Sequence, residues 1–213
     1  MNRLTNNLES IAEQIRLVFS AKDAAREKAL PLCREVIRHC SDAIRAVHRQ
    51  EFDPARDLLK SARNLLNEAV QAVSAHSEFS NTGFIRDAQK EFAEGSITLA
   101  LVTGKPLPDP GELGIDSAAY LNGLGEAVGE LRRYLLDSMR RGDLSRGEDL
   151  LSAMDDIYGV LVTMDFPDAI TGGLRRTTDM VRGVLERTRS DLTLVIRQRE
   201  LENRLEKFED KIR

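Results

Sequence analysis

One pattern constrains the fold of this chain more than any other: apolar residues recur at the 3.6-residue period of an α-helix along almost its whole length. The period predicts helices over about 2–20, 22–50, 54–76, 84–103, 117–141, 144–163 and a last stretch running to residue 213. The first two stretches are either one helix or two, since neither Pro nor Gly separates them. No segment is predicted as a strand. The fold class is therefore all-α, a bundle of about six or seven mostly long helices in one domain, 1–213.

Prolines and capping residues mark the expected helix boundaries. Asp53 followed by Pro54 is typical of a helix start, with Asp as the N-cap and Pro at the first helical position. Three prolines within residues 104–111 forbid a helix there, so this segment is expected to be a loop. Either Asp116 or Ser117 is expected to cap the helix that follows. One bundle core covers only part of so many long helices, so the remaining apolar faces predict an oligomer.

Composition excludes several classes of protein. The net charge of −4 argues against a strongly basic nucleic-acid-binding protein, although a local basic face remains compatible with it. No apolar run approaches the ~20 residues that span a bilayer, and the N-terminal sequence resembles no signal peptide. Cys33 and Cys40 lie roughly 10 Å apart along a helix, too far for a disulfide. Buried free thiols and a cytoplasmic location are therefore expected.

The overall charge conceals an acidic middle segment. Residues 81–169 contain 16 Asp and Glu against 8 Lys and Arg, whereas both flanks are slightly basic. Within this segment Glu91 and Glu94 lie three residues apart, on one face of a largely apolar helix. Carboxylates there are costly unless a cation lies between them, either an Arg side chain or a hard divalent ion such as Mg²⁺. Because such ions catalyse phosphodiester cleavage, a metal-dependent nuclease is one hypothesis.

Other acidic groups have simpler interpretations. Glu126 and Glu130 are four residues apart, and pairing with Arg133 or with another helix explains them equally well. Acidic residues at 143, 148 and 149 favour the start of a helix through its dipole. The three histidines are scattered without a zinc spacing, and the chain contains no P-loop, GxSxG, HExxH or dinucleotide fingerprint.

Two basic stripes are candidate contacts for phosphates. The first lies on one face of the 22–50 stretch, and the second repeats the helical spacing on the next helix. The alternative for both is a solvated helix face, because acidic residues are interspersed. The candidate RNA-binding residues are Arg34, Arg38, Arg45 and Arg49 from the first stripe, with Lys60 and Arg63 from the second, which also contains Arg56.

Several motifs resemble those of one known family. They are YLNGLGEAVGELRR over 120–133, RGD over 141–143, MDDIY over 154–158 and FPDAITGGLRR over 166–176. In combination they resemble the family of translin and translin-associated factor X (TRAX), with the archaeal members most similar. The long-helix layout matches over essentially the whole chain.

The resemblance implies an all-α protomer that assembles into a hollow, roughly octameric shell. It also implies binding of single-stranded or short structured RNA, or of single-stranded DNA, inside that shell. The TRAX branch of the family has an endoribonuclease site that depends on Mg²⁺ or Mn²⁺, with two acids in a Gln-Glu-x-x-Glu segment. The matching segment here is 90–94, which contains Glu91 and Glu94. Translin itself lacks this pair, so the chain resembles the catalytic branch at this position.

An ungapped comparison from residues 129–131 places Ser145 and Asp149 at the positions of two further family acids. The catalytic residues are therefore expected to be Glu91, Glu94 and Asp149, and the metal ligands these three with Glu130. The hypothesis is an RNA-binding, Mg²⁺-dependent endoribonuclease. Its alternative is a non-catalytic shell like translin, which Ser145 favours, and a helical scaffold without a nucleic-acid role is a third interpretation.

Overall fold

The computed structural model describes residues 5–80 and 83–212, and in these ranges all regular secondary structure is helical. Within these ranges, six helices are long and three have a single turn, which confirms the all-α prediction of about six or seven mostly long helices. The helices are α1 (Leu8–His48), α2 (Phe52–Ala72), α3 (Ser77–Ser80), α4 (Gly83–Val102), α5 (Pro110–Leu113), α6 (Ser117–Arg140), α7 (Gly147–Thr163), α8 (Asp168–Thr171) and α9 (Leu174–Ile212).

The first two predicted stretches form one helix, α1, which continues through Pro31. Helix α2 starts two residues earlier than predicted. Its N-cap position is Glu51, and the carboxylate of Asp53 forms an ion pair with Arg56 instead of capping the helix. The prediction of Asp53 as the N-cap was therefore wrong, because the helix begins at Phe52 and Asp53 already lies in its first turn.

The start of α6 resolves the alternative that the sequence left open. Asp116 is the N-cap, and its carboxylate accepts hydrogen bonds from the backbone N–H groups of Ala118 and Ala119. The proline-rich 104–111 segment is a loop as far as Asp109, which forms a capping box with Glu112 around the single turn of α5. Both caps fix the entry of the chain into α6, the helix that contributes Glu126 to the site described below.

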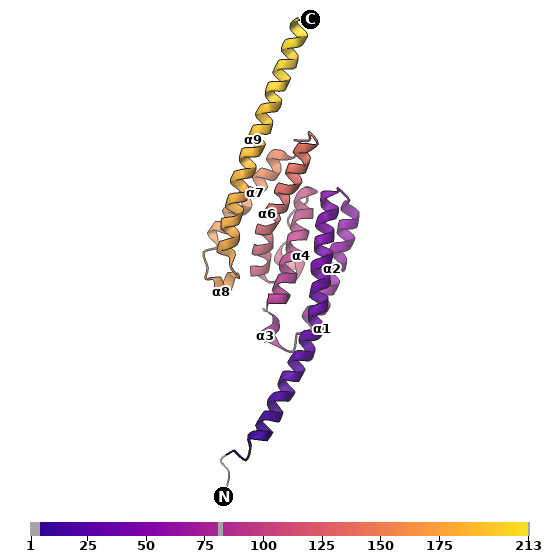
Figure 1. The fold of residues 1–213 in the computed structure, drawn as a ribbon, viewed down its shortest axis with the longest axis vertical. Coiled ribbons are helices and arrows are strands. Elements are labelled where there is room, and N and C mark those ends of the chain that lie inside the picture. The colour runs from indigo at the N-terminus through magenta and orange to yellow at the C-terminus, as the bar shows by residue number, and fades with distance from the viewer. Residues whose placement is uncertain (1–4, 81–82, 213) are drawn as a thin grey trace.

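The long helices lie side by side and share one hydrophobic core (Figure 1). Helix α1 packs against α2 and α4, α4 packs against α6, and α6 packs against both α7 and α9. Many core positions are alanines, including Ala43, Ala62, Ala88, Ala93 and Ala127. Small side chains let helix axes approach closely, so polar groups on neighbouring helices come within contact distance.

Cys33 and Cys40 lie in this core as free thiols, which confirms the prediction of buried, unbridged cysteines. Burial raises the pKa of the Cys33 thiol to about 11. Burial, with the charges of Glu91 and Glu94 adding to it, also raises the pKa of Cys40. Both thiols are therefore protonated at neutral pH and behave as small apolar core residues.

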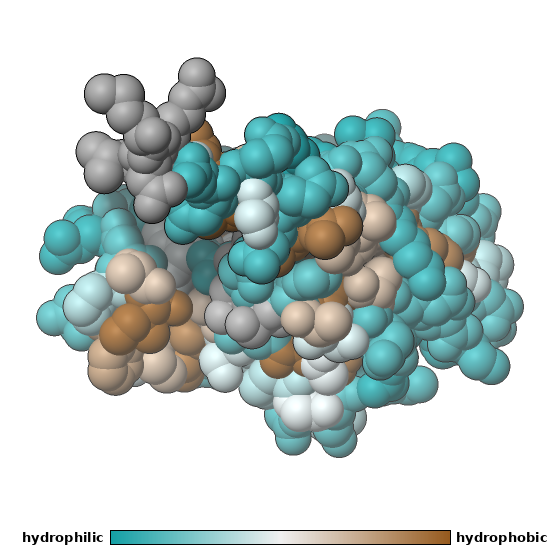
Figure 2. Space-filling model, turned by 90° about the horizontal axis from the view of Figure 1, so that it is seen from below, coloured by the Kyte–Doolittle hydropathy of each residue, from teal (hydrophilic) through white to brown (hydrophobic). Residues whose placement is uncertain are grey.

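Both ends of the chain extend beyond the bundle, at opposite ends of the molecule (Figure 1). The extensions expose apolar side chains: Leu8, Ile11, Ile15, Val18 and Phe19 on α1, and Leu194, Leu201, Leu205, Phe208 and Ile212 on α9. Figure 2 looks at the lower end of Figure 1 and shows a further apolar patch on its left, at the α8 end of the bundle. Exposed Val162, Phe166 and Ile170 belong to this end. None of the helices described is both long and apolar enough to cross a membrane.

Candidate metal centre

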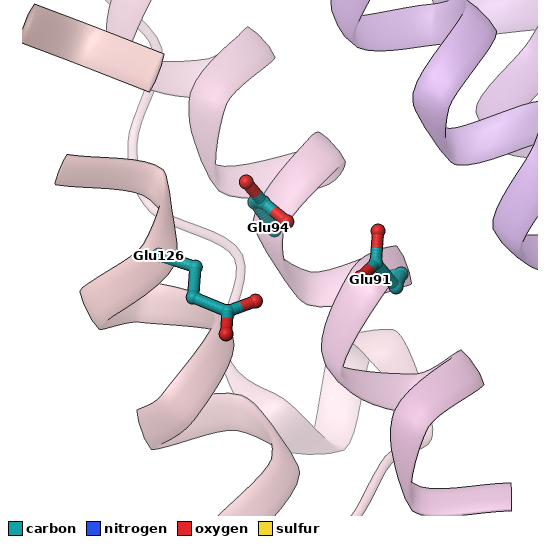
Figure 3. A group of neighbouring side chains, drawn as sticks. All are labelled: Glu91, Glu94 and Glu126. Carbon is teal, nitrogen blue, oxygen red and sulfur yellow. The ribbon is translucent and has the colours of Figure 1, made fainter. Parts of the chain in front are cut away.

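Three carboxylates from two helices meet in the middle of the bundle. Glu91 and Glu94 lie one turn apart on α4, and Glu126 extends toward them from α6 (Figure 3). One oxygen of each lies within 4.8 Å of one oxygen of each other. Each side chain is only half-buried, so the cluster remains accessible from solvent. We call Glu91, Glu94 and Glu126 the acidic cluster.

A glycine brings the two helices together at this point. A Cβ atom built on Gly123 of α6 would lie 2.6 Å from both the Cβ of Ala93 and the carbonyl oxygen of Lys90 on α4. No larger residue fits there, and α6 consequently crosses α4 in direct contact with residues 90–94. Glu126 follows Gly123 by three residues and so lies on the same face of α6, which directs its carboxylate toward Glu91 and Glu94.

The pKa values of the cluster reflect burial and mutual repulsion. Burial, with the charges of Glu91, Glu126 and Glu130 adding to it, raises the pKa of Glu94 to about 8. Burial also raises the pKa of Glu91, with contributions from Glu126, Asp87 and Glu130. Without a cation between them, Glu94 is therefore protonated over much of the neutral range. Perturbed carboxyl pKa values of this kind are frequent at functional sites.

Lys90 supplies one positive charge at the edge of the cluster. Its ammonium group donates a hydrogen bond of 2.8 Å to Glu126. Burial lowers the pKa of Lys90, but the hydrogen bond and the neighbouring carboxylates outweigh burial and raise the pKa overall. One ammonium is thus shared among three carboxylates, which leaves the cluster with an excess of negative charge.

Glu130 lies beside the cluster but has its own partner. Nε2 of His48 lies 2.5 Å from a carboxylate oxygen of Glu130, and the His48 side chain is 6% exposed. This hydrogen bond, with the charges of His48 and Arg133 adding to it, lowers the pKa of Glu130. Glu130 therefore stays ionised while Glu94 is protonated. The prediction of pairing with Arg133 also holds, at the longer distance of 3.8 Å.

A cavity of about 330 Å³ opens between α1, α4 and α6 next to these carboxylates. Glu91, Glu94 and Glu130 line it together with Arg45 and Arg133. Arg45 belongs to the first basic stripe, and it forms an ion pair with Asp42 and a hydrogen bond of 2.9 Å with Ser41. The structure thus brings one predicted RNA-binding residue into the same cavity as two predicted catalytic residues.

The other predicted RNA-binding residues lie elsewhere. Arg38 and Arg49 form ion pairs with Glu35 and Glu51, and their side chains are more than half exposed. Arg34 is exposed on the same helix. Lys60 and Arg63 lie on α2, at a different pocket that contains none of the acidic cluster. The structure therefore separates the two basic stripes.

Asp149 does not join the acidic cluster. It lies at the start of α7, its side chain is 71% exposed, and its carboxylate accepts a hydrogen bond of 3.2 Å from Arg146. Arg146 also donates to the carbonyl oxygen of Leu101, which is seven residues, or roughly 10 Å, beyond Glu94 along α4. Ser145 precedes α7 in an exposed turn, where its N–H donates to Asp143. Neither Ser145 nor Asp149, the two positions that the ungapped comparison assigns to family acids, belongs to the acidic cluster.

Glu126 is the member of the acidic cluster that the sequence analysis did not include among the expected metal ligands. The chain offered one signal for it, since the motif over 120–133 contains Gly123 followed three and seven residues later by Glu126 and Glu130. A glycine inside a helix indicates a close helix crossing, and acids on the same face then point to the neighbouring helix. The sequence alone does not say which helix that neighbour is.

Comparison with known proteins supports the class that the fold defines, an all-α helical bundle. No family model matches the chain. It is 30% identical over 190 residues to the uncharacterized protein MJ0175 of Methanocaldococcus jannaschii, covering 88% of this chain and 84% of that protein. The structure of AfC3PO in complex with duplex RNA is similar with a TM-score of 0.76 and 33% identity, over 91% of this chain and 98% of that one.

A third solved structure has the same fold at lower sequence identity. The structure of apo-NeC3PO, at 16% identity, matches 91% of this chain and all of its own with a TM-score of 0.73, which concerns the fold alone. The C3PO structures are members of the translin and TRAX family. The chain therefore belongs to the translin and TRAX family, which confirms the resemblance identified from its motifs.

Proposed function

We propose that this protein is an RNA-binding, Mg²⁺-dependent endoribonuclease whose metal site is the acidic cluster. The observation that carries the proposal is the convergence of Glu91, Glu94 and Glu126 within 4.8 Å of one another. The proposed set keeps Glu91 and Glu94 from the sequence and replaces Asp149 by Glu126. Glu130 adjoins the set, and its hydrogen bond with His48 makes it an orienting neighbour.

The cluster fits a hard divalent cation on chemical grounds. All three donors are carboxylate oxygens, which Mg²⁺ and Mn²⁺ prefer. Burial and repulsion raise the pKa of Glu94 to about 8, and a cation among the three groups would remove that repulsion. When bound there, Mg²⁺ would supply the Lewis acidity and the activated water that phosphodiester hydrolysis requires.

The protein's own groups have separate tasks in this proposal. Arg45 lines the cavity beside Glu91 and Glu94, where its guanidinium can hold a backbone phosphate of the RNA. Lys90 lies 2.8 Å from Glu126 and supplies positive charge next to the cleaved bond. AfC3PO, at 33% identity, has been solved with duplex RNA, which supports RNA as the ligand class. Single-stranded RNA and single-stranded DNA present the same phosphates.

The assembly that we propose is a homo-oligomeric shell, octamer-like, built from single-domain protomers that span residues 1–213. Apolar side chains are exposed on the extensions of α1 and α9 and at the α8 end of the bundle, where Figure 2 shows an apolar patch. These side chains support contacts between copies. Enclosing the cluster in such a shell would limit substrates to short or flexible RNA.

The test is a cleavage assay with a labelled single-stranded RNA and a short duplex, each with Mg²⁺ or with EDTA. Glu91→Gln, Glu94→Gln and Glu126→Gln are each expected to lower the cleavage rate about a hundredfold or more while RNA binding in EDTA is retained. Glu68→Gln, on the exposed face of α2, is the matched control. Asp149→Asn is expected to cleave like the unmodified protein. Cleavage that survives Glu126→Gln but not Asp149→Asn would overturn the assignment of the site.

One observation favours the alternative of a non-catalytic, translin-like shell that only holds RNA. The ion pair between Lys90 and Glu126 partly neutralises the cluster without any metal. On this alternative Lys90→Gln would strengthen metal binding without producing cleavage. RNA binding that is independent of Mg²⁺, with no product in any assay, would select the alternative.

A further inference from the structure

A second pocket lies on the opposite side of α4 from the acidic cluster. It occupies about 340 Å³ between α2, the second half of α4 and the proline-rich loop. Ser96, Leu99 and Thr103 line it, and at 100° per residue they lie on a helix face roughly opposite that of Glu91 and Glu94. We call this space the α2–α4 pocket.

Four cations surround the α2–α4 pocket. Arg56, Lys60 and Arg63 come from α2 at spacings of four and three residues, and Lys105 comes from the loop after α4. None of the residues that line the pocket is acidic. The second basic stripe of the sequence thus lines a cavity, and Lys105, from the loop after α4, adds a fourth positive charge to the lining.

Two of these cations are held in place and two are available. Arg56 forms an ion pair of 2.6 Å with Asp53, and Arg63 donates to the backbone carbonyl of Glu112. Over the residues that the structure describes, the ammonium groups of Lys60 and Lys105 have neither a hydrogen bond nor an ion pair. Like charges around one cavity repel one another, and an anion in the cavity would relieve that repulsion.

The floor of the pocket is apolar. Leu59, Leu99 and Leu113 form it, each at most 9% exposed, and Pro106 and Pro108 border it. A small inorganic anion would use only the charged rim, and a neutral apolar ligand would use only the floor. A ligand that combines a flat, weakly polar ring with a phosphate complements both parts.

We propose that the α2–α4 pocket binds a single nucleotide, with its base against the apolar floor and its phosphate between Lys60 and Lys105. The nucleotide is either free or the terminal unit of an RNA strand, since both present the same chemistry. This binding is independent of the proposed cleavage, because no residue of the pocket belongs to the acidic cluster.

The experiment measures binding of AMP, adenosine and inorganic phosphate to the full chain by isothermal titration calorimetry in EDTA. AMP is expected to bind at least tenfold more tightly than adenosine or phosphate. Lys60→Gln and Lys105→Gln are each expected to weaken AMP binding about tenfold, which corresponds to the loss of one charge-assisted hydrogen bond. Lys28→Gln, an exposed cation on α1 outside both basic stripes, is the matched control and is expected to leave the affinity unchanged.

A second variant tests the floor separately from the rim. Ala100 is 8% exposed and lines the pocket, so Ala100→Leu would fill it while all four cations remain. This variant is expected to abolish AMP binding. Competition between AMP and short RNAs with a 5′-phosphate or a 5′-hydroxyl then distinguishes a free nucleotide from a strand end.

Three results would overturn the proposal: no AMP binding, equal affinity for AMP and adenosine, or AMP binding that survives both lysine substitutions. Cleavage activity is measured in parallel. Loss of AMP binding with unchanged cleavage would leave the proposed nuclease intact, so failure of one proposal is distinguishable from failure of the other.

Discussion

Replacing Glu94 by Gln is expected to stabilise the metal-free protein, and the gain is expected to grow with pH. Burial is the main cause that raises the pKa of Glu94 from 4.5 to about 8, and the charge of Glu91 is the next. A carboxyl with a raised pKa binds its proton more tightly in the folded chain than in the unfolded chain. Stability is therefore lost as the pH rises from the unfolded pKa through the folded one. One pKa unit corresponds to about 1.4 kcal/mol. The Glu94 carboxyl therefore lowers the free energy of unfolding by roughly 1 kcal/mol at pH 5 and roughly 4 kcal/mol at pH 8.

The assay is urea unfolding in EDTA at pH 5 and pH 8, at one fixed protein concentration because an oligomer's stability depends on it. The gain in free energy of unfolding from Glu94→Gln is expected to be about 3 kcal/mol larger at pH 8 than at pH 5. Glu68→Gln is the control and is expected to give no such difference. Adding Mg²⁺ at pH 8 is expected to stabilise the unmodified protein more than Glu94→Gln. An equal effect of Glu94→Gln at both pH values would refute the reasoning from burial and repulsion.

Three further predictions concern the packing around the site. Gly123→Ala places a Cβ 2.6 Å from the α4 backbone and is expected to lower the free energy of unfolding in urea by about 1–3 kcal/mol. Gly129→Ala is its control: a Cβ there would have no atom within 4 Å, so no loss of stability is expected. Asn122→Ala removes hydrogen bonds that join α6 to the α8 and α9 region, and a loss of about 2 kcal/mol or more is expected in the same assay. Cys33 and Cys40 are expected to resist a thiol reagent at neutral pH until urea unfolds the chain, so rapid labelling of the native protein would contradict their burial.

The fold class could be predicted from the sequence because helix formation depends on local spacing. The apolar period, the proline-rich loop and the Asp116 cap lie within segments of a few turns, and the helices they predict are present in the structure. The predicted N-cap at Asp53 failed because the helix begins one residue before it, with Glu51 at the N-cap position. Residue types alone do not specify at which residue a helix begins to within one or two positions.

In the candidate site, too, only the features set by local spacing could be predicted from the sequence. Glu91 and Glu94 were predictable as a pair, since three residues along one helix fix their common face. The proximity of Glu126 to this pair was not predictable, and the ungapped comparison along the chain selected Asp149, which lies away from them. Likewise, the stripe on α2 could be found from its spacing, but Lys105 completes its pocket from another segment.

The sequence by itself determined which segments are helical and which side chains share a face of each helix, because both follow from the 3.6-residue period. Only the tertiary structure decided which faces meet. Gly123 lets α6 approach α4 closely enough for Glu126 to reach Glu91 and Glu94. That crossing depends on many weak contacts between residues far apart in the chain, and no single local pattern encodes their sum.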